Sequence, residues 1–204
     1  MTTPREQIHR LYRHHHGYLL SDAEDRRVAR TGSSSTYGEI RPGAVGRLLQ
    51  LLAPTADDVV YDLGSGIGKV VLQLAMSCRV RRAVGVELVA SRHEIATRVL
   101  DRARHRGLLA TDDVELRCAD LMHTPLEDAT LLYTCSTAFP DPFMRRMARR
   151  LAKLRPGLRL VTTQELDPPG RFVLEQRLKL PMTWNRLGLV HVYRLGEPRR
   201  RRSG

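Results

Sequence analysis

Carboxylates and glycines occur together in one short stretch of this chain. Asp62 stands two positions before Gly64, the first of three glycines that follow a short apolar run, and the other two are Gly66 and Gly68. Glu87 ends the next strand-like apolar run. Glycines let a ligand approach the main chain, and a carboxylate in the second place accepts hydrogen bonds from ribose hydroxyls in nucleotide-binding βαβ units. The pattern therefore predicts a nucleoside-binding turn.

The glycine spacing narrows the class of ligand. Gly-x-Gly-x-Gly differs from the Gly-x-Gly-x-x-Gly of dinucleotide folds, and a phosphate-binding loop would need a glycine at Leu63 and a hydroxyl at Val70. Asp62 would repel a pyrophosphate but would attract an ammonium group. S-adenosylmethionine (SAM) carries a nucleoside, a sulfonium and an ammonium group without a phosphate, so we expect it as the cofactor. A glycine turn that binds nothing is the alternative.

Two other segments carry residues suited to ligand contact. Tyr37 and Glu39 flank Gly38 just before a predicted helix, as in a loop that touches a ligand, although an ordinary turn has the same composition. Asp120 and Leu121 follow the third predicted strand, where they suit recognition of an adenine base. A role of Asp120 as a helix cap explains it equally well.

Apolar runs and helical patterns alternate along the chain, and two runs of alternating polarity follow them. Strands that alternate with helices predict a parallel sheet, and the last two runs predict an antiparallel hairpin at its edge. The predicted fold class is α/β, with a Rossmann-like doubly wound sheet of seven strands. The predicted strands are 59–63, 83–87, 114–118, 129–135, 158–163, 172–180 and 187–195, and the main helices begin near Pro42, Val70, Ser91 and Phe143.

The composition limits the classes of partner. The chain has 204 residues and a formal net charge of +12, which favours an acidic partner such as nucleic acid, unless arginine is simply abundant. No apolar run approaches the ~20 residues of a membrane helix, so we expect no membrane contact. Three isolated cysteines and a solvated run from His14 to His16 predict no metal site, and a reducing, cytoplasmic location fits them.

The predicted domain organisation has three parts. Residues 1–36 form a helical N-terminal segment that ends in a flexible Gly/Ser/Thr linker from Thr31 to Thr36. Residues 37–195 form the SAM-binding domain. Residues 196–204, which include four consecutive arginines from Arg199 to Arg202, form a basic disordered tail.

Several of these motifs together resemble a known family. The motifs are Tyr37-Gly38-Glu39, Asp62 to Gly68, Val71-Leu72-Gln73, Gly85-Val86-Glu87 and Ala138-Phe139. Their order and spacing are similar to those of the Dot-one family (disruptor of telomeric silencing), the histone-lysine methyltransferases without a SET domain. The resemblance covers residues 31–194 and implies a seven-stranded class I methyltransferase fold that binds SAM.

The resemblance also implies roles for single residues in cofactor binding. Tyr37 and Glu39 would cover the methionine end of SAM, which Asp62 and the Gly64 main chain would hold. Glu87 would bind the ribose, and Asp120 with Leu121 the adenine. The full set of expected cofactor-binding residues is Tyr37, Glu39, Asp62, Gly64, Ser65, Gly66, Gly68, Lys69, Glu87, Leu88, Asp120 and Leu121.

The acceptor side departs from the family pattern. The family carries an Asn-Asn-Phe-x-Phe-like run, and the matching segment here runs from Cys135 to Phe139 without the asparagine pair. Trp184 matches a channel tryptophan, and His191 stands where the family has a tyrosine. We expect Phe139, Trp184 and His191 to form an aromatic wall, Ser136 to hydrogen-bond the acceptor amine and His191 to accept its proton.

These observations lead to one expected function and to stated alternatives. We expect direct in-line methyl transfer from SAM to a lysine of a protein, with a basic or nucleic-acid-associated protein as partner and nonspecific nucleic-acid contact through the arginine-rich surface and tail. The alternatives are a methyltransferase for a small molecule or nucleic acid and a non-catalytic basic module that binds SAM. An NAD-dependent oxidoreductase is disfavoured by the glycine spacing and by Asp62.

Overall fold

The computed structural model describes residues 2–198, and these form one seven-stranded sheet. The strand order is β3-β2-β1-β4-β5-β7-β6, with β1 to β5 parallel and β7 antiparallel to both β5 and β6. The predicted fold class, including the antiparallel edge hairpin, is confirmed. The strands are β1 Val59–Leu63, β2 Arg82–Glu87, β3 Val114–Cys118, β4 Leu131–Thr134, β5 Arg159–Thr162, β6 Phe172–Leu180 and β7 Gly188–Leu195.

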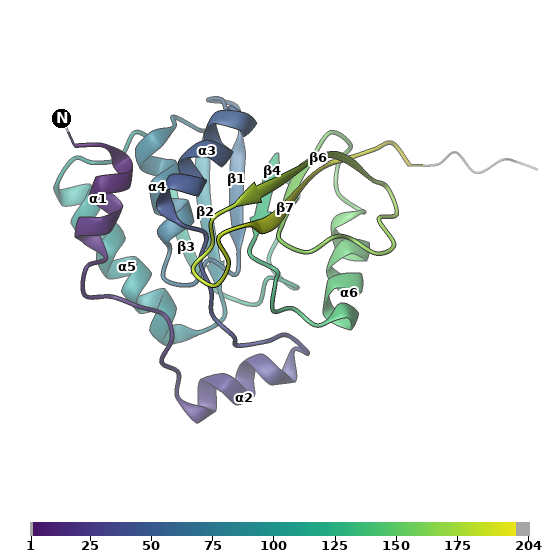
Figure 1. Cartoon of the computed structure of the whole chain (residues 1–204), viewed down its shortest axis with the longest axis horizontal. Coiled ribbons are helices and arrows are strands. Elements are labelled where there is room, and N and C mark those ends of the chain that lie inside the picture. The colour runs from purple at the N-terminus through teal and green to yellow at the C-terminus, as the bar shows by residue number, and fades with distance from the viewer. Residues whose placement is uncertain (1, 199–204) are drawn as a thin grey trace, which may run out of the picture.

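Helices cover both faces of the sheet. The helices are α1 Pro4–Leu11, α2 Asp22–Arg30, α3 Pro42–Leu52, α4 Lys69–Ser77, α5 Ala90–His105 and α6 Asp141–Leu151. One core cluster joins α1, α3, α4 and α5 to the sheet, and the other joins α6 to the opposite face. All five residues of β1 are buried, as expected of a strand with helices on both faces (Figure 1).

The N-terminal segment contributes to the main core. Helix α1 begins with a capping box in which Thr3 and Glu6 exchange hydrogen bonds, and its Ile8 and Leu11 side chains are buried. Tyr12, directly after α1, donates a 2.8 Å hydrogen bond from its hydroxyl to the Ile67 carbonyl oxygen. Helix α1 is therefore joined to the turn between β1 and α4. The predicted domain boundary at residue 36 stays a prediction.

Helix α2 lies apart from the other helices, near the carboxyl ends of the central strands (Figure 1). A second capping box, between Ser21 and Glu24, begins this helix. The predicted linker from Thr31 to Thr36 contains no helix or strand and returns the chain to the sheet.

Some predicted boundaries were displaced by a few residues. Helix α6 begins at Asp141 rather than Phe143, because Pro140 is its N-cap and Pro142 fits the first turn of a helix. Strand β4 is shorter than the predicted 129–135, and α4 begins one residue early, at Lys69. The tail arginines Arg199 to Arg202 lie outside the described residues. In residues 2–198 no helix has the length and apolarity needed to cross a bilayer.

Candidate active site

The glycine turn after β1 adopts the backbone conformation that its sequence predicts. Gly64, Gly66 and Gly68 have positive φ angles of 79°, 55° and 82°. Residues with a side chain rarely adopt this region, so glycine is required at the three positions. The Gly64 amide also donates a 2.8 Å hydrogen bond to the Val86 carbonyl oxygen, which joins the turn to β2.

A cavity of about 350 Å³ opens beside this turn. It lies at the carboxyl ends of the central parallel strands, where ligands bind in open α/β sheets. Strand ends, the loop after α2 and the turn between β6 and β7 together form its walls. Nine of the residues predicted for the site line it: Tyr37, Gly64, Gly66, Glu87, Leu88, Asp120, Leu121, Phe139 and Trp184.

Glu87 connects the glycine turn to the end of β2. One carboxylate oxygen accepts a 2.7 Å hydrogen bond from the Gly66 amide, and the other accepts a 2.9 Å bond from the Val89 amide. The side chain is buried and lines the cavity. Glu87 therefore fixes the shape of the turn, and each carboxylate oxygen has a further lone pair that can accept a bond from a ribose hydroxyl.

Asp62 is buried behind the turn and is not among the residues that line the cavity. Burial, with the nearby negative charge of Glu87, raises the pKa of Asp62 to about 8. A cation placed next to Asp62 would favour its ionised form. The role of Asp62 at the methionine end of the cofactor stays a prediction.

Tyr37, Glu39 and Lys69 form a hydrogen-bonded chain. The Tyr37 hydroxyl donates to Glu39 at 2.5 Å, and Lys69 Nζ donates to the other Glu39 oxygen at 2.7 Å. Burial, followed by the negative charge of Glu39, raises the pKa of Tyr37, which keeps its hydroxyl protonated. The Tyr37 ring lies against Gly66, where a Cβ would come within 2.7 Å of the ring. The chain thus holds Tyr37 over the glycine turn.

Asp120 begins a turn rather than a helix, so the helix-cap alternative is not observed, and its role toward an adenine base stays a prediction. Its Oδ1 accepts a 2.7 Å hydrogen bond from the Met122 amide, which is the capping role of a turn. Asp120 also lines the cavity together with Leu121, at the end of β3. The cap fixes the carboxylate in place and leaves it accessible from the cavity.

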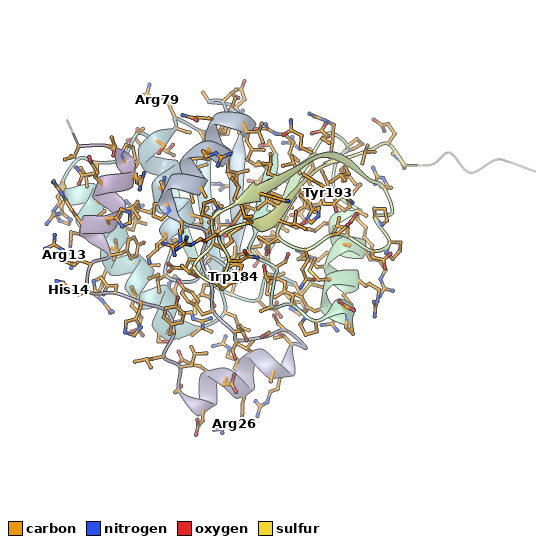
Figure 2. All side chains as sticks on the ribbon, in the orientation of Figure 1. Arg13, His14, Arg26, Arg79, Trp184 and Tyr193 are labelled. Atoms are coloured by element: carbon orange, nitrogen blue, oxygen red, sulfur yellow. The ribbon has the colours of Figure 1, made fainter. Side chains whose placement is uncertain are left out.

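The opposite wall of the cavity is aromatic. Phe139 follows β4 and packs edge-on against Phe143, with ring centroids 4.9 Å apart. Figure 2 shows Trp184 near the middle of the molecule, on the turn between β6 and β7. The indole covers Gly38, where a Cβ would lie 2.4 Å from the ring. Cys135, without the asparagine side chain of the family pattern, also lines this wall.

Main-chain contacts join the loop before α3 to the last hairpin. The Thr183 amide donates to the Glu39 carbonyl oxygen at 2.8 Å, and the Glu39 amide donates to Thr183 Oγ1 at 3.0 Å. Ile40 and Met182 form an antiparallel bridge next to them. These contacts place Tyr37 and Trp184 on the same side of the cavity.

The structure does not bring Ser136 and His191 into the cavity. Ser136 is fully buried, and its hydroxyl accepts a 3.1 Å hydrogen bond from the Gln164 amide. His191 pairs with Thr162 across the sheet. It lies on the same face of β7 as Tyr193, and the two rings stack with centroids 6.2 Å apart. Both side chains are buried and neither lines the cavity, so their predicted contacts with an acceptor amine stay predictions.

Four other expected cofactor residues lie behind the cavity wall: Glu39, Ser65, Gly68 and Lys69. Glu39 bonds to Tyr37, and Lys69 bonds to Glu39, in the hydrogen-bonded chain described above. Gly68 packs closely on α5, because a Cβ there would come within 2.9 Å of Ala96 Cβ. These residues support the turn without forming the surface of the cavity.

Sequence reasoning missed a buried arginine and one wall of the cavity. Arg92, on α5, lines the cavity and is 6% exposed. Thr31, Ser33, Ser34 and Thr36 line it from the predicted flexible linker, with Val28 from α2. The arginine-rich α5 gave no signal that distinguished Arg92 from its exposed neighbours, and Gly/Ser/Thr composition indicates mobility rather than a binding wall.

Solved structures similar to this one include methyltransferases with known ligands. An RNA methyltransferase from Salinibacter ruber, in complex with S-adenosyl-L-homocysteine, superposes with a TM-score of 0.61 and 25% identity, over 76% of this chain and 92% of that chain. A structure described as that of a putative RNA methyltransferase from Pyrococcus horikoshii gives a TM-score of 0.58 at 16% identity, over 99% of this chain and 100% of that chain. These structures show the class I methyltransferase fold.

Sequence similarity to curated proteins identifies a narrower group than the shared fold does. A histone-lysine N-methyltransferase specific for lysine 79 of histone H3, from Drosophila melanogaster, is 28% identical over 72% of this chain and 8% of its own length. The corresponding Yarrowia lipolytica protein is 24% identical over 74% of this chain and 32% of its own length. The chain therefore spans a third or less of these relatives. The family model described as "Histone methylation protein DOT1" matches residues 18–187. This chain belongs to the DOT1 family.

Proposed function

We propose that this protein is a SAM-dependent methyltransferase that methylates a lysine side chain of a protein. The observation that carries the proposal is one cavity that joins a nucleoside-type cradle to an aromatic wall. Gly64, Gly66 and Glu87 form the cradle, and Phe139 and Trp184 belong to the wall. Membership of the DOT1 family and the fold shared with methyltransferases support it.

The residues of the site fit the cofactor. The positive-φ glycines leave room at the main chain where a nucleoside would lie, and the fixed carboxylate of Glu87 is available to its hydroxyls. Asp62 would ionise when an ammonium group is placed next to it, and Asp120 with Leu121 suits an adenine base. SAM, when bound, supplies a methyl group activated by its sulfonium.

The protein's own contribution to transfer is to orient an amine and remove its proton. A free lysine has a pKa of ~10.4 and is charged at neutral pH, so it must lose a proton before it can react. An apolar, water-poor wall disfavours the charged form and lowers this pKa. Tyr37, Phe139 and Trp184 line the cavity and offer apolar surface against which an amine would be desolvated and oriented. The amine's proton would leave to water at the mouth of the cavity.

The proposal extends to the partner. The relatives act on a histone, as their names state, and the net charge of +12 favours partners that carry nucleic acid. We therefore propose a basic, nucleic-acid-associated protein as substrate, with nonspecific nucleic-acid contact through the arginine-rich surface. The cytoplasmic location stays a prediction.

The test of the cofactor site is calorimetric titration with SAM. Wild-type protein is expected to bind SAM, and Asp62→Ala and Glu87→Ala are expected to weaken binding at least about ten-fold. Glu87→Ala removes a buried acceptor that fixes the glycine turn, and Asp62→Ala removes the carboxyl group that would ionise beside the ammonium group. Glu94→Ala, which changes an exposed carboxylate on α5, is the matched control and should leave affinity unchanged. Equal affinity in all four proteins would contradict the assigned cradle.

The test of the acceptor is transfer of a labelled methyl group. Purified histones and a protein extract are offered together with RNA, and the product is treated separately with protease and with ribonuclease. Label that is lost only with protease supports the lysine proposal. Label that is lost only with ribonuclease would favour RNA as acceptor, the second candidate, which the 25% identity to an RNA methyltransferase supports.

A further inference from the structure

Arg92 is an unusual residue for the interior of a ligand cavity. Its side chain is 6% exposed, and burial lowers its pKa from the ordinary value, while Glu87, Tyr37 and Glu24 oppose this shift. Burying a guanidinium is costly unless its donors are satisfied. Its hydrogen bonds go to main-chain carbonyl oxygens, so the cost of burial is offset by contacts with the backbone.

The two carbonyl groups come from the two ends of one segment. Arg92 Nε donates to the Gly17 oxygen at 2.8 Å, and Nη2 donates to the Ser35 oxygen at 2.8 Å. The two ends of residues 17–36, a segment that includes α2, are therefore both hydrogen-bonded to the Arg92 side chain. We call this segment the strap. Figure 1 shows that α2 within the strap lies away from the sheet, so the strap needs such anchors.

The same guanidinium also supports Tyr37. Arg92 Cζ lies 4.6 Å from the centre of the Tyr37 ring, within the range of a cation–π contact. A Cβ at Gly17 would come within 2.5 Å of the Tyr37 ring, so the start of the strap packs directly against that ring. Tyr18 adds an edge-on contact to Tyr37 with centroids 5.2 Å apart. Arg92 thus joins both strap ends to the residue that covers the glycine turn.

Two further hydrogen bonds hold the middle of the strap. A Glu24 carboxylate oxygen accepts a 2.8 Å hydrogen bond from the Ser91 amide, next to Arg92. Arg146 Nη2, from α6, donates to the Thr31 carbonyl oxygen at 2.5 Å. The Arg146 bond is exposed, whereas the Glu24 bond is partly buried and helps to lower the pKa of Glu24 to about 2. Arg92 differs from both because one buried side chain bonds the two ends of the strap.

The strap is a wall of the cavity. Its Val28, Thr31, Ser33, Ser34 and Thr36 face the space that Glu87 and Asp120 border on the other side. When a binding site is complete only in a closed conformation, the observed dissociation constant rises as the closed fraction falls. A residue that holds the strap closed therefore lowers the observed dissociation constant for the cofactor, even when it lies outside the glycine turn.

We propose that Arg92 is a positioning residue that latches the strap and Tyr37 over the cofactor cavity, an inference that rests on the proposed function. Cofactor affinity then depends on the two Arg92 hydrogen bonds. The rate of methyl transfer at saturating SAM depends on them less, because the bound cofactor itself favours the closed strap. Through these two hydrogen bonds, closure of residues 17–36 and cofactor binding favour each other.

The first test compares three variants by calorimetry with SAM. Arg92→Met removes both hydrogen bonds and the cation, and is expected to raise Kd at least about ten-fold, which corresponds to a closed fraction near one tenth. Arg92→Lys keeps the cation but cannot donate to both carbonyl groups, so an intermediate Kd is expected. Arg102→Met changes an exposed arginine on the same helix and should leave Kd unchanged.

The second test observes the strap directly. Trypsin can cut after Arg26, Arg27 and Arg30, which all lie in α2 within the strap. Arg92→Met is expected to speed this cleavage in the absence of SAM, whereas Arg102→Met is not. Steady-state kinetics should show a larger rise of KM for SAM than fall of kcat, a split that a loss of folded protein would not produce.

The outcomes separate the latch from the proposed function. Wild-type protein that binds no SAM would overturn the proposed function, and cleavage that is unchanged in Arg92→Met would overturn the latch by itself. If Arg92→Met does not fold, Gly17→Ala replaces it in both tests. This variant keeps Arg92 but adds a Cβ that must displace the Tyr37 ring. A Kd for SAM equal to that of the wild type would then overturn the proposal.

Discussion

At the scale of single residues, Asp62 titrates near neutral pH, because burial and Glu87 raise its pKa to about 8. Below that pH the protein alone holds the proton, and a bound ammonium group would release it. The association constant for SAM is therefore expected to rise with pH between about 6 and 7.5, by at most ~10-fold per pH unit. Calorimetry in two buffers of different ionisation enthalpy measures the released proton.

Asp62→Asn provides the control for this pH dependence. The amide keeps the shape of the side chain and has no proton to release, so both the released proton and the slope of affinity with pH should disappear. A wild-type protein that releases no proton on binding SAM at pH 7 would place the ammonium group away from Asp62.

At the scale of elements, the loop before α3 and the β6–β7 turn form the aromatic wall through one close contact. A Cβ at Gly38 would lie 2.4 Å from the Trp184 ring, so Gly38→Ala must displace the indole. We expect methyl transfer to a lysine acceptor to fall at least about ten-fold, because the wall that desolvates the amine is opened. Kd for SAM should change by less than about three-fold. Transfer assays and calorimetry measure the two effects.

Gly46→Ala is the matched control for that substitution. Gly46 lies within α3, and a Cβ there would meet nothing closer than 4.0 Å, so the change should leave transfer intact and stabilise the helix slightly. Equal transfer rates in Gly38→Ala and Gly46→Ala would show that Trp184 does not shape the acceptor site.

The elements also show which features a sequence can predict. Strand β1 was predicted to the residue, and β2 and β5 to within one residue at each end, because strands covered on both faces are continuous apolar runs such as Val59 to Leu63. The glycine turn was predicted because its positive φ angles require glycine, and Glu87 because it ends the next strand. His191 was predicted from its place in a family pattern, but the register of β7 turns its side chain toward Tyr193 and away from the cavity.

The strap was not predicted as part of the site. Its wall residues are small and polar, and its anchors are main-chain carbonyl groups at Gly17 and Ser35, which have no side-chain signature. Arg92 is one of many arginines in the chain, and only its burial distinguishes it. Long-range contacts of this kind determine the shape of the cavity and leave no local pattern.

At the scale of the whole molecule, the net charge of +12 predicts salt-sensitive binding to nucleic acid. Each phosphate neutralised contributes a slope of about −0.9 to the dependence of log K on log salt for duplex DNA. We expect a steep negative slope in fluorescence anisotropy with a labelled duplex, and a shallower one after residues 199–204 are deleted. Equal slopes would show that the four terminal arginines make no contact.

The hydrogen bonds between Glu39 and Thr183 connect positions 144 residues apart. During synthesis, the ribosome produces the glycine turn and the parallel strands long before it produces the last hairpin. A nascent chain can therefore assemble the nucleoside cradle first, while the side facing the acceptor is still open to water. Under the proposed function, the acceptor wall is therefore the last part of the site that the folding chain completes, after the cradle for the methyl donor.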